Sequence, residues 1–259
     1  MVRSYREITP QLARQIKLVM ADVDGTMTAS DDSISAVASE AARQLEKAGI
    51  TVGLVSGRTI YGLEALAKKL GISGPIIAEN GAVAKLKVSD ELVNLGYSRQ
   101  PALNALEKLK KIFPGAIKER EDNRERLVDV VFWALGIDKA KLLKHLEDVE
   151  LLDSGFILHL MLRGISKGKT LLSLLGQIRE GSLSPDEVMV FGDSTTDISL
   201  FELFPHSVLI INPRLPAKER QLLEKAAEYA SDLPFGDGFA EVARYIIAAR
   251  RGYKEAPKS

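Results

Sequence analysis

The sequence of 259 residues predicts an α/β fold with a doubly wound parallel sheet and an inserted α+β domain. Short apolar runs rich in β-branched residues alternate with segments in which apolar residues recur every three or four positions. This alternation is present near both ends of the chain. The middle of the chain instead carries longer strand-like runs. We therefore expect a core formed by residues 1–82 and 165–259, with residues 83–164 inserted as a second domain.

The first half of the expected core alternates strand and helix. Residues 17–21, "KLVMA", form an apolar run typical of a buried strand. Residues 35–49 have apolar side chains at helical spacing, and Gly49 is a typical helix stop. The next expected elements are a strand at 51–56, a helix near 60–70 and a strand at 75–79.

The same alternation returns after the insert. The elements expected there are a helix at 167–180, strands at 187–192 and 207–212, and helices near 216–228 and 238–249. Within the insert, the long runs 126–136 and 149–164 are expected as strands, with helices near 101–113 and 138–148. Long strands with helices between them indicate an α+β module that serves as a lid or second domain.

Composition and charge exclude several classes of protein. Lys+Arg and Asp+Glu both number 35, so the formal net charge is 0, and nothing indicates nucleic acid or an anionic membrane surface as a partner. No window approaches the roughly 20 apolar residues of a membrane span, and no signal peptide is evident, so a cytoplasmic location is expected. The absence of cysteine excludes disulfides, thiolate zinc sites and a cysteine nucleophile.

Polar side chains follow three of the expected core strands, at the point where each strand ends. Asp22 and Asp24 follow the strand at 17–21, Ser56 and Arg58 follow the strand at 51–56, Asp193 and Asp197 follow the strand at 187–192, and Lys167 and Lys169 begin the helix at 167–180. Each group alone has an ordinary explanation as a turn, a helix cap or a surface lysine. Because ligands of an open parallel sheet bind beyond the carboxyl ends of its strands, their joint position favours one shared site.

The residue types predict phosphate chemistry with a divalent cation. Several carboxylates on one edge of a sheet repel one another unless a cation offsets their charge. Ligands that are all oxygen suit Mg²⁺, which typically combines a few carboxylates with substrate phosphate. A lysine and a helix N-terminus supply charge and N–H donors for phosphate oxygens. An aspartate can attack phosphorus, and a second aspartate two residues on can serve as general acid and base.

Four motifs in this order, "DVDGT", "SGR", "SKG" and "GDSTTD", resemble those of the haloacid dehalogenase (HAD) superfamily of phosphohydrolases. The insert resembles the C2-type cap of the Cof-like branch, and "AENGA" at 78–82 is typical of that branch. "DSGFILHLMLRG" and "GDSTTDISLFEL" look most like archaeal-type phosphoglycolate phosphatases. The resemblance implies a Rossmann-like core with a C2-type cap domain. It also implies a Mg²⁺-dependent phosphomonoester hydrolase of a small phosphorylated metabolite, with phosphoglycolate as a candidate.

The resemblance further implies a catalytic role for each matching residue. Asp22 matches the nucleophile, and Asp24 matches the general acid and base. Ser56 matches the hydroxyl that binds phosphate. Lys167 matches the lysine that neutralises phosphate and nucleophile, and Lys169 is the fallback for that role.

The same match implies a metal site formed by Asp22, Asp24, Asp193 and Asp197, to which Asp24 gives its backbone carbonyl. Asp193 matches a direct ligand, and Asp197 matches a direct or an outer ligand. Thr196 departs from the pattern, because relatives commonly carry Asn at this position. Thr has one hydroxyl on a shorter side chain, whereas Asn has an amide group that both donates and accepts hydrogen bonds. The change bears on outer contacts and substrate preference and leaves the metal ligands intact.

The residues that bind the rest of the substrate are expected mainly in the insert. Arg58, Arg124 and Arg163 are candidates for a substrate carboxylate, because an Arg fork matches a carboxylate. Arg126 and His159 are further candidates. The charged run around Arg124 and Arg126 is also typical of a solvated loop, and His159 is also typical of an ordinary sheet surface.

Other functions remain open to a sequence of this kind. A sugar-phosphate phosphatase or a phosphomutase of the same superfamily would share the core motifs, and a degenerate scaffold that binds phosphorylated ligands would share the fold. Dinucleotide binding is excluded, because no G-x-G-x-x-G follows the first strand. Both a monomer and a homodimer are compatible with the sequence.

Overall fold

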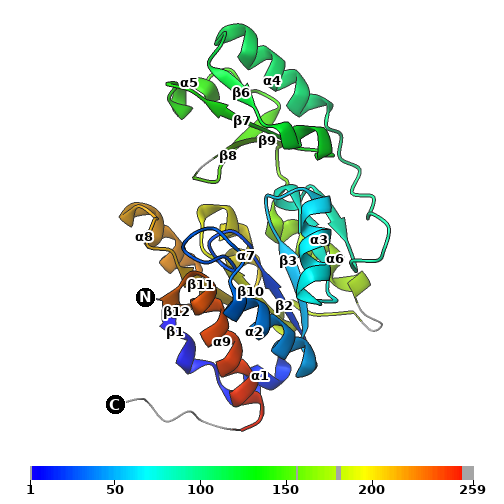
Figure 1. Ribbon diagram of the computed structural model, residues 1–259, viewed down its shortest axis with the longest axis vertical. Helices are drawn as coiled ribbons and strands as arrows, with labels where there is room; N and C mark the ends of the chain where they lie inside the picture. The colour runs from blue at the N-terminus through cyan, green and yellow to red at the C-terminus, as the bar shows by residue number, and fades with distance from the viewer. Residues whose placement is uncertain (1, 156, 179–181, 253–259) are drawn as a thin grey trace.

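The computed structural model describes residues 2–155, 157–178 and 182–252. Within these ranges the chain forms an eight-stranded sheet and a four-stranded sheet (Figure 1). The larger sheet has the order β1-β12-β11-β10-β2-β3-β4-β5, and its neighbours are parallel except β4 and β5. The chain builds outward from β2 first to one side and later to the other. The predicted doubly wound, Rossmann-like α/β core is therefore confirmed.

The core elements follow the expected alternation. Its strands are β1 (Arg3–Ser4), β2 (Leu18–Ala21), β3 (Thr51–Val55), β4 (Ile76–Ala78), β5 (Val83–Lys85), β10 (Val188–Gly192), β11 (His206–Ile211) and β12 (Tyr229–Pro234). Its helices are α1 (Pro10–Gln15), α2 (Ala36–Lys47), α3 (Ile60–Leu70), α6 (Lys167–Ile178), α7 (Ile198–Leu203), α8 (Ala217–Ala226) and α9 (Phe235–Arg250). Short 3₁₀ helices cover Tyr5–Glu7, Glu79–Gly81, Glu121–Glu125, Pro185–Glu187 and Thr195–Asp197. Residues 179 and 180, which end the helix predicted at 167–180, lie outside the described residues.

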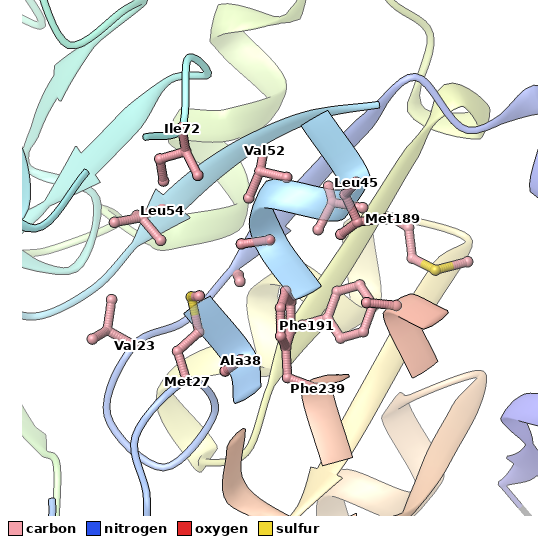
Figure 2. Packing of buried hydrophobic residues seen from close by; sticks show 14 of the residues in the cluster. Val23, Met27, Ala38, Leu45, Val52, Leu54, Ile72, Met189, Phe191 and Phe239 are labelled. Atoms are coloured by element: carbon pink, nitrogen blue, oxygen red, sulfur yellow. The ribbon is translucent and has the colours of Figure 1, made fainter. Parts of the chain in front are cut away.

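Both faces of the large sheet are packed. Alternate residues of a strand point to opposite faces, so each strand contributes to two apolar layers. On one face Val52, Leu54, Met189 and Phe191 pack with residues of α2 and α9, including Leu45 and Phe239 (Figure 2). On the other face Leu18, Met20, Val188 and Val190 pack with Leu171 and Leu174 of α6. Because β2 lies between these layers, all four of its residues are buried, which explains its uninterrupted apolar sequence.

The insert forms a smaller antiparallel sheet with helices on one face, which we call the cap. Its elements are α4 (Gln100–Ile112), β6 (Ile117–Glu119), β7 (Val130–Ala134), α5 (Lys139–Leu143), β8 (Val149–Asp153) and β9 (Leu158–Leu162), with the strand order β6-β7-β9-β8. Leu106 of α4 packs against Phe132 and Leu160 of the sheet. The opposite face is turned toward the core, because Met161 of β9 belongs to the main core cluster. Figure 1 shows the cap standing over one end of the core.

The run 149–164, predicted as one strand, is instead a hairpin, and this prediction was wrong. Strands β8 and β9 pair antiparallel with each other, so the chain reverses between Asp153 and Leu158. Gly155 has φ +89°, a conformation that glycine adopts readily. The backbone N–H of Ser154 donates to the carbonyl of Ile157 at 3.1 Å and closes the turn. The amphipathic pattern continues across the turn and conceals it.

Two further elements differ from the expected boundaries. The strand predicted at 126–136 begins only at Val130, because the preceding N–H groups bond to a core carboxylate described below. Strand β5 lies within the expected insert, yet it pairs with β4 in the core sheet. Strand β12 was not predicted, since "YASDLP" carries polar residues suited to its place near the sheet edge.

Among the helices of the described ranges, none combines the length and apolar character needed to cross a bilayer.

Candidate active site

The carboxyl ends of three core strands meet at one edge of the sheet. Strand β2 pairs in parallel with both β3 and β10, so their ends lie side by side. Asp22 follows β2, Ser56 follows β3 and Asp193 follows β10, and all three side chains are buried. The structure thus brings together residues that are distant in the sequence, at the edge where ligands of such sheets bind.

Lys167 is the charged centre of this edge. As the first residue of α6, it is 2% exposed, and its Nζ donates to Asp22 Oδ1 and Asp197 Oδ1, both at 2.7 Å. It also donates to Thr196 Oγ1 at 3.1 Å, so this hydroxyl contacts the lysine. Lys169 is exposed and donates instead to the carbonyl of Gly164. Of the two lysines considered, only Lys167 lies at the aspartates.

Asp193 is held by neutral donors. Thr26 Oγ1 donates to its Oδ1 at 3.0 Å, and Asn212 Nδ2 donates to its Oδ2 at 2.7 Å. Gly25 permits this approach, because a Cβ there would lie 2.1 Å from Asp193 Oδ2, and its φ is +88°. Neither Thr26 nor Asn212 was a predicted site residue. The threonine of "DVDGT" was visible in the sequence, whereas nothing local marked Asn212.

The buried carboxylates perturb one another's ionisation. Burial raises the pKa of Asp193 to about 7, with a further increase from Asp197, although bonds from Asn212 and Thr26 oppose it. Burial also raises the pKa of Asp22 well above its usual range, against the opposing charge of Lys167. The pKa of Lys167 is raised despite its burial, because Asp197 and Asp22 surround its ammonium. The edge therefore carries more negative charge than one lysine offsets.

These carboxylates fit a divalent cation. Asp22, Asp193 and Asp197 each offer an oxygen within 4.8 Å of the others, and all three are buried. Oxygen-only donors suit a hard cation, and the raised pKa values show that further positive charge would be accommodated. Asp197 is already engaged, since its Oδ2 accepts from the backbone N–H groups of Asp193 and Ser194 and its Oδ1 accepts from Lys167. Both oxygens of Asp193 also accept hydrogen bonds, whereas within the described residues the carboxylate of Asp22 accepts from Lys167 alone.

Asp24 pairs with Arg58, whereas Asp22 pairs with Lys167. Arg58 holds it in a bidentate ion pair, with Nε at 2.9 Å from Oδ2 and Nη2 at 2.5 Å from Oδ1. The hydrogen bonds that Arg58 donates to Asp24 raise the pKa of Arg58. Both side chains are about one third exposed, in contrast to the buried Asp22. Ser56 lies beside this pair, and its Oγ accepts from the backbone N–H of Arg58 at 3.3 Å.

The other arginines named from the sequence lie elsewhere. Arg124 is exposed and pairs with Glu121 of the same turn, and Arg163 is exposed and donates to the carbonyl of Glu147. Neither contacts the aspartate edge. Arg126 is buried and donates to the carbonyl of Gly57 at 3.0 Å, which connects the cap to the loop that follows β3.

Glu79 joins the cap to the core, and sequence reasoning assigned it no role. This fully buried residue has φ +50°, and its carboxylate accepts the backbone N–H groups of Leu127, Val128 and Asp129 at 2.8 to 2.9 Å. Burial and the charge of Asp129 raise the pKa of Glu79 to about 7. The "AENGA" motif was noted only as a family signature. The contact explains why β7 begins late.

Glu79→Ala is expected to destabilise the protein by about 2–4 kcal/mol, because three buried N–H groups lose their acceptor. The pKa of Glu79 is raised in the folded state, so its contribution is full below the unfolded pKa near 4.5 and is lost as pH rises through about 7. The difference from wild type should therefore be larger at pH 5 than at pH 8. Chemical denaturation at both pH values measures it, with exposed Glu125→Ala as control. Equal effects of the two variants would contradict this account.

Comparisons with known proteins agree with this geometry. The family model for haloacid dehalogenase-like hydrolases matches residues 19–124 and 114–221. The phosphoglycolate phosphatase of Methanoculleus marisnigri is 37% identical over 235 residues, which are 88% of this chain and 96% of that protein. The phosphoglycolate phosphatase of Thermoplasma volcanium is 31% identical, with 88% and 96% covered.

Solved structures show the same architecture. A crystal structure of a Thermoplasma acidophilum protein superposes with a TM-score of 0.75 at 28% identity, covering 89% of this chain and 98% of that one. A haloacid dehalogenase-like hydrolase from Bacteroides thetaiotaomicron has a TM-score of 0.69 at 22% identity, covering 89% and 99%, which supports the fold alone. With the family match and these relatives, the chain belongs to the haloacid dehalogenase-like hydrolases.

Proposed function

We propose that this phosphatase hydrolyses a small phosphorylated metabolite through an aspartyl-phosphate intermediate, with phosphoglycolate as the first candidate substrate. The observation that carries the proposal is the buried group of Asp22, Lys167 and Asp193 at the carboxyl edge of the sheet. Ser56 lies on the adjacent strand end, where its hydroxyl is available to phosphate. The names of the relatives support phosphoglycolate as the candidate.

The reaction would proceed in two displacements at phosphorus, the first by Asp22 and the second by water. As an oxygen of Asp22 bonds to phosphorus, the bond from phosphorus to the substrate oxygen breaks, and Asp24 delivers a proton to that leaving oxygen. Asp24 then takes a proton from water as the water oxygen attacks phosphorus. This second displacement breaks the bond to Asp22 and releases inorganic phosphate. Both oxygens of Asp24 accept from Arg58, and each keeps a second lone pair that can hold the transferred proton.

Positive charge at the site supports both displacements. Lys167 holds Asp22 in place and offsets the charge of the phosphoryl oxygens, while Asp197 orients the lysine. A divalent cation, Mg²⁺ by proposal, would be held by Asp22, Asp193 and the Asp24 carbonyl, and when bound it supplies charge stabilisation at the phosphoryl group. The cap stands over this edge and would exclude water.

A phosphate-release assay over a panel of phosphate esters tests the proposal. The panel holds phosphoglycolate, sugar phosphates and p-nitrophenyl phosphate, each with Mg²⁺ or with a chelator. We expect phosphoglycolate to give the highest kcat/KM and the chelator to abolish release. A sugar phosphate as the preferred substrate would replace phosphoglycolate, and no release from any ester with Mg²⁺ would refute the catalytic assignment.

Mg²⁺ is expected to raise the Tm of the metal-free protein, and to raise it more at pH 8 than at pH 5.5. The raised pKa of Asp193, about 7, means that its stabilising proton is lost as pH rises through this value, and the cation then replaces the missing positive charge. At 100 times the dissociation constant the gain would be about 2.7 kcal/mol.

Asp193→Asn should abolish the effect of Mg²⁺ on the Tm, whereas exposed Asp186→Asn should preserve it. Thermal denaturation with and without Mg²⁺ makes the comparison. An unchanged Mg²⁺ response in Asp193→Asn would place the cation elsewhere.

A further inference from the structure

We propose that His159 of the cap binds the substrate, with its Nε2 donating to a carboxylate that the substrate carries close to its phosphate. This inference rests on the proposed phosphatase reaction and names the group that selects the substrate. Arg124 and Arg163 of the cap lie elsewhere, and Arg126 is already bound to Gly57, Asp122 and Asp129. The recognition of the substrate therefore falls to a different residue.

The position of His159 places it at the interface between cap and core. It lies in the middle of β9, on the sheet face opposite α4, and it is 2% exposed. Its cross-strand partners are Val131 on β7 and Leu152 on β8. Met161, two residues further along β9, packs in the main core cluster. In Figure 1, β9 lies on the core side of the cap and α4 on the far side. His159 is therefore a buried polar group on the core-facing side of the cap sheet.

The ring of His159 lies close to the loop expected to bind phosphate. A Cβ added to Gly57 would lie 3.2 Å from Cε1 of His159, and Gly57 stands between Ser56 and Arg58. Arg126 reinforces this contact from the cap by donating to the Gly57 carbonyl. A substrate whose phosphate is bound at Ser56 would thus extend toward the imidazole within a short distance.

The buried carboxylate of Asp129 fixes the orientation of the ring. Its Oδ2 lies 2.8 Å from His159 Nδ1, and its Oδ1 accepts from Arg126 Nη1 at 2.7 Å. Burial opposes the charge of Asp129, yet the bonds from His159 and Arg126 keep its pKa below the usual range. An ionised carboxylate only accepts, so Nδ1 carries a proton. Asn80 Nδ2 also lies 3.2 Å from Nδ1, but a protonated Nδ1 cannot accept from this amide nitrogen.

The other ring nitrogen is the one available to a ligand. Within the described residues, the hydrogen bonds of His159 all involve Nδ1, and Nε2 has no protein partner. The neighbouring cations are already engaged, since Lys167 bonds to Asp22 and Asp197, and Arg58 bonds to Asp24. Because Nδ1 carries a proton, Nε2 donates only when the ring is an imidazolium, and Nε2–H is then a charged donor. Its natural partner is an anionic oxygen, and its closeness to Gly57 favours a short acid such as phosphoglycolate over a bulky sugar phosphate.

A matched pair of variants separates the two ring nitrogens. The side-chain amide of His159→Asn reaches the Nδ1 position and can keep the bond to Asp129, but it has no group at the Nε2 position. The amide of His159→Gln reaches the Nε2 position and can still donate there. Steady-state kinetics with phosphoglycolate, 2-phospholactate, 3-phosphoglycerate and the carboxylate-free ester p-nitrophenyl phosphate compares both variants with wild type in Mg²⁺.

His159→Asn should raise the KM for the preferred carboxylated ester by about 10-fold or more, the loss expected for a charge-assisted hydrogen bond. Its kcat/KM for p-nitrophenyl phosphate should stay within about twofold of wild type, since that ester has no carboxylate. His159→Gln should raise the KM less. Equal losses on all esters, or an unchanged KM in His159→Asn, would overturn the inference.

The same experiment distinguishes this inference from the proposed substrate. If wild type prefers another carboxylated ester to phosphoglycolate and His159→Asn removes that preference, phosphoglycolate fails as substrate and the role of His159 stands. If wild type prefers no carboxylated ester, the role of His159 is refuted, whereas hydrolysis of the other esters still supports the phosphatase reaction. Circular dichroism and Tm values confirm that both variants are folded.

Discussion

The Asp22→Asn variant is expected to lose at least about 10³-fold in kcat, or roughly 4 kcal/mol of transition-state stabilisation, while it folds at least as stably as wild type. An amide oxygen is a poor nucleophile toward phosphorus, so the first displacement fails. The gain or preservation of stability has a separate cause. Asp22 is buried beside Asp193 and Asp197, and its raised pKa shows that its charge is unfavourable there. Removal of that charge relieves the repulsion.

Phosphate release and thermal denaturation of the metal-free proteins check the two halves of this prediction. Acid quenching of wild type during turnover, followed by peptide mass spectrometry, should detect phosphate on Asp22, and the variant should carry none. The exposed Asp186→Asn serves as control for the loss of one carboxylate. Turnover close to that of wild type in Asp22→Asn would rule out Asp22 as the nucleophile.

Lys167→Met is expected to cost about 3–5 kcal/mol of stability and to abolish activity, because it leaves two buried carboxylates without their cation. Lys167 contacts Asp22 and Asp197 at 2.7 Å, and all three side chains are buried. Methionine fills a similar volume, so lost charge rather than lost packing dominates. The carboxylates can protonate at low pH. Since the ammonium no longer opposes burial, the raised pKa of Asp22 should rise further, and the loss of stability should be larger at pH 8 than at pH 5.

Lys169→Met is the matched control for Lys167→Met. Lys169 lies two residues further along α6, but it is exposed and contacts only the carbonyl of Gly164. A change there should stay within about 0.5 kcal/mol of wild type, as for most surface substitutions. Urea denaturation at both pH values and phosphate release measure the two variants. If Lys169→Met abolished activity and Lys167→Met did not, the phosphate-neutralising lysine would have to be reassigned.

The sequence predicted the core of the site because that part depends on local order. A buried strand, a turn and a helix each have a short-range pattern, and parallel strands bring their carboxyl ends to the same edge. Once the strands before Asp22, Ser56 and Asp193 were recognised, their convergence followed, and the structure brings these residues together. Lys167 was predicted as the lysine that neutralises phosphate, with Lys169 as the alternative. The structure distinguishes them because Lys167 is buried and Lys169 is exposed.

The cap was predicted less well because its contacts join segments that no local pattern connects. The alternation over 149–164 fits a strand in either direction, so the turn at Gly155 was missed. Arg124 and Arg163 were named because an Arg fork matches a carboxylate, but both bond to groups at the cap surface. Arg126 looked like part of the same solvated run, yet it is buried and reaches Gly57.

The sequence by itself determined the α/β core, the edge at which its charged residues gather and the family to which the chain belongs. The tertiary structure alone decided that Arg58 holds Asp24, that Glu79 binds three N–H groups of the cap, and that Asp129 orients His159. The physical reason is the range of the forces involved. Hydrophobic periodicity and turn chemistry act between near neighbours in the chain, whereas a buried carboxylate finds its donors only when distant segments are packed together.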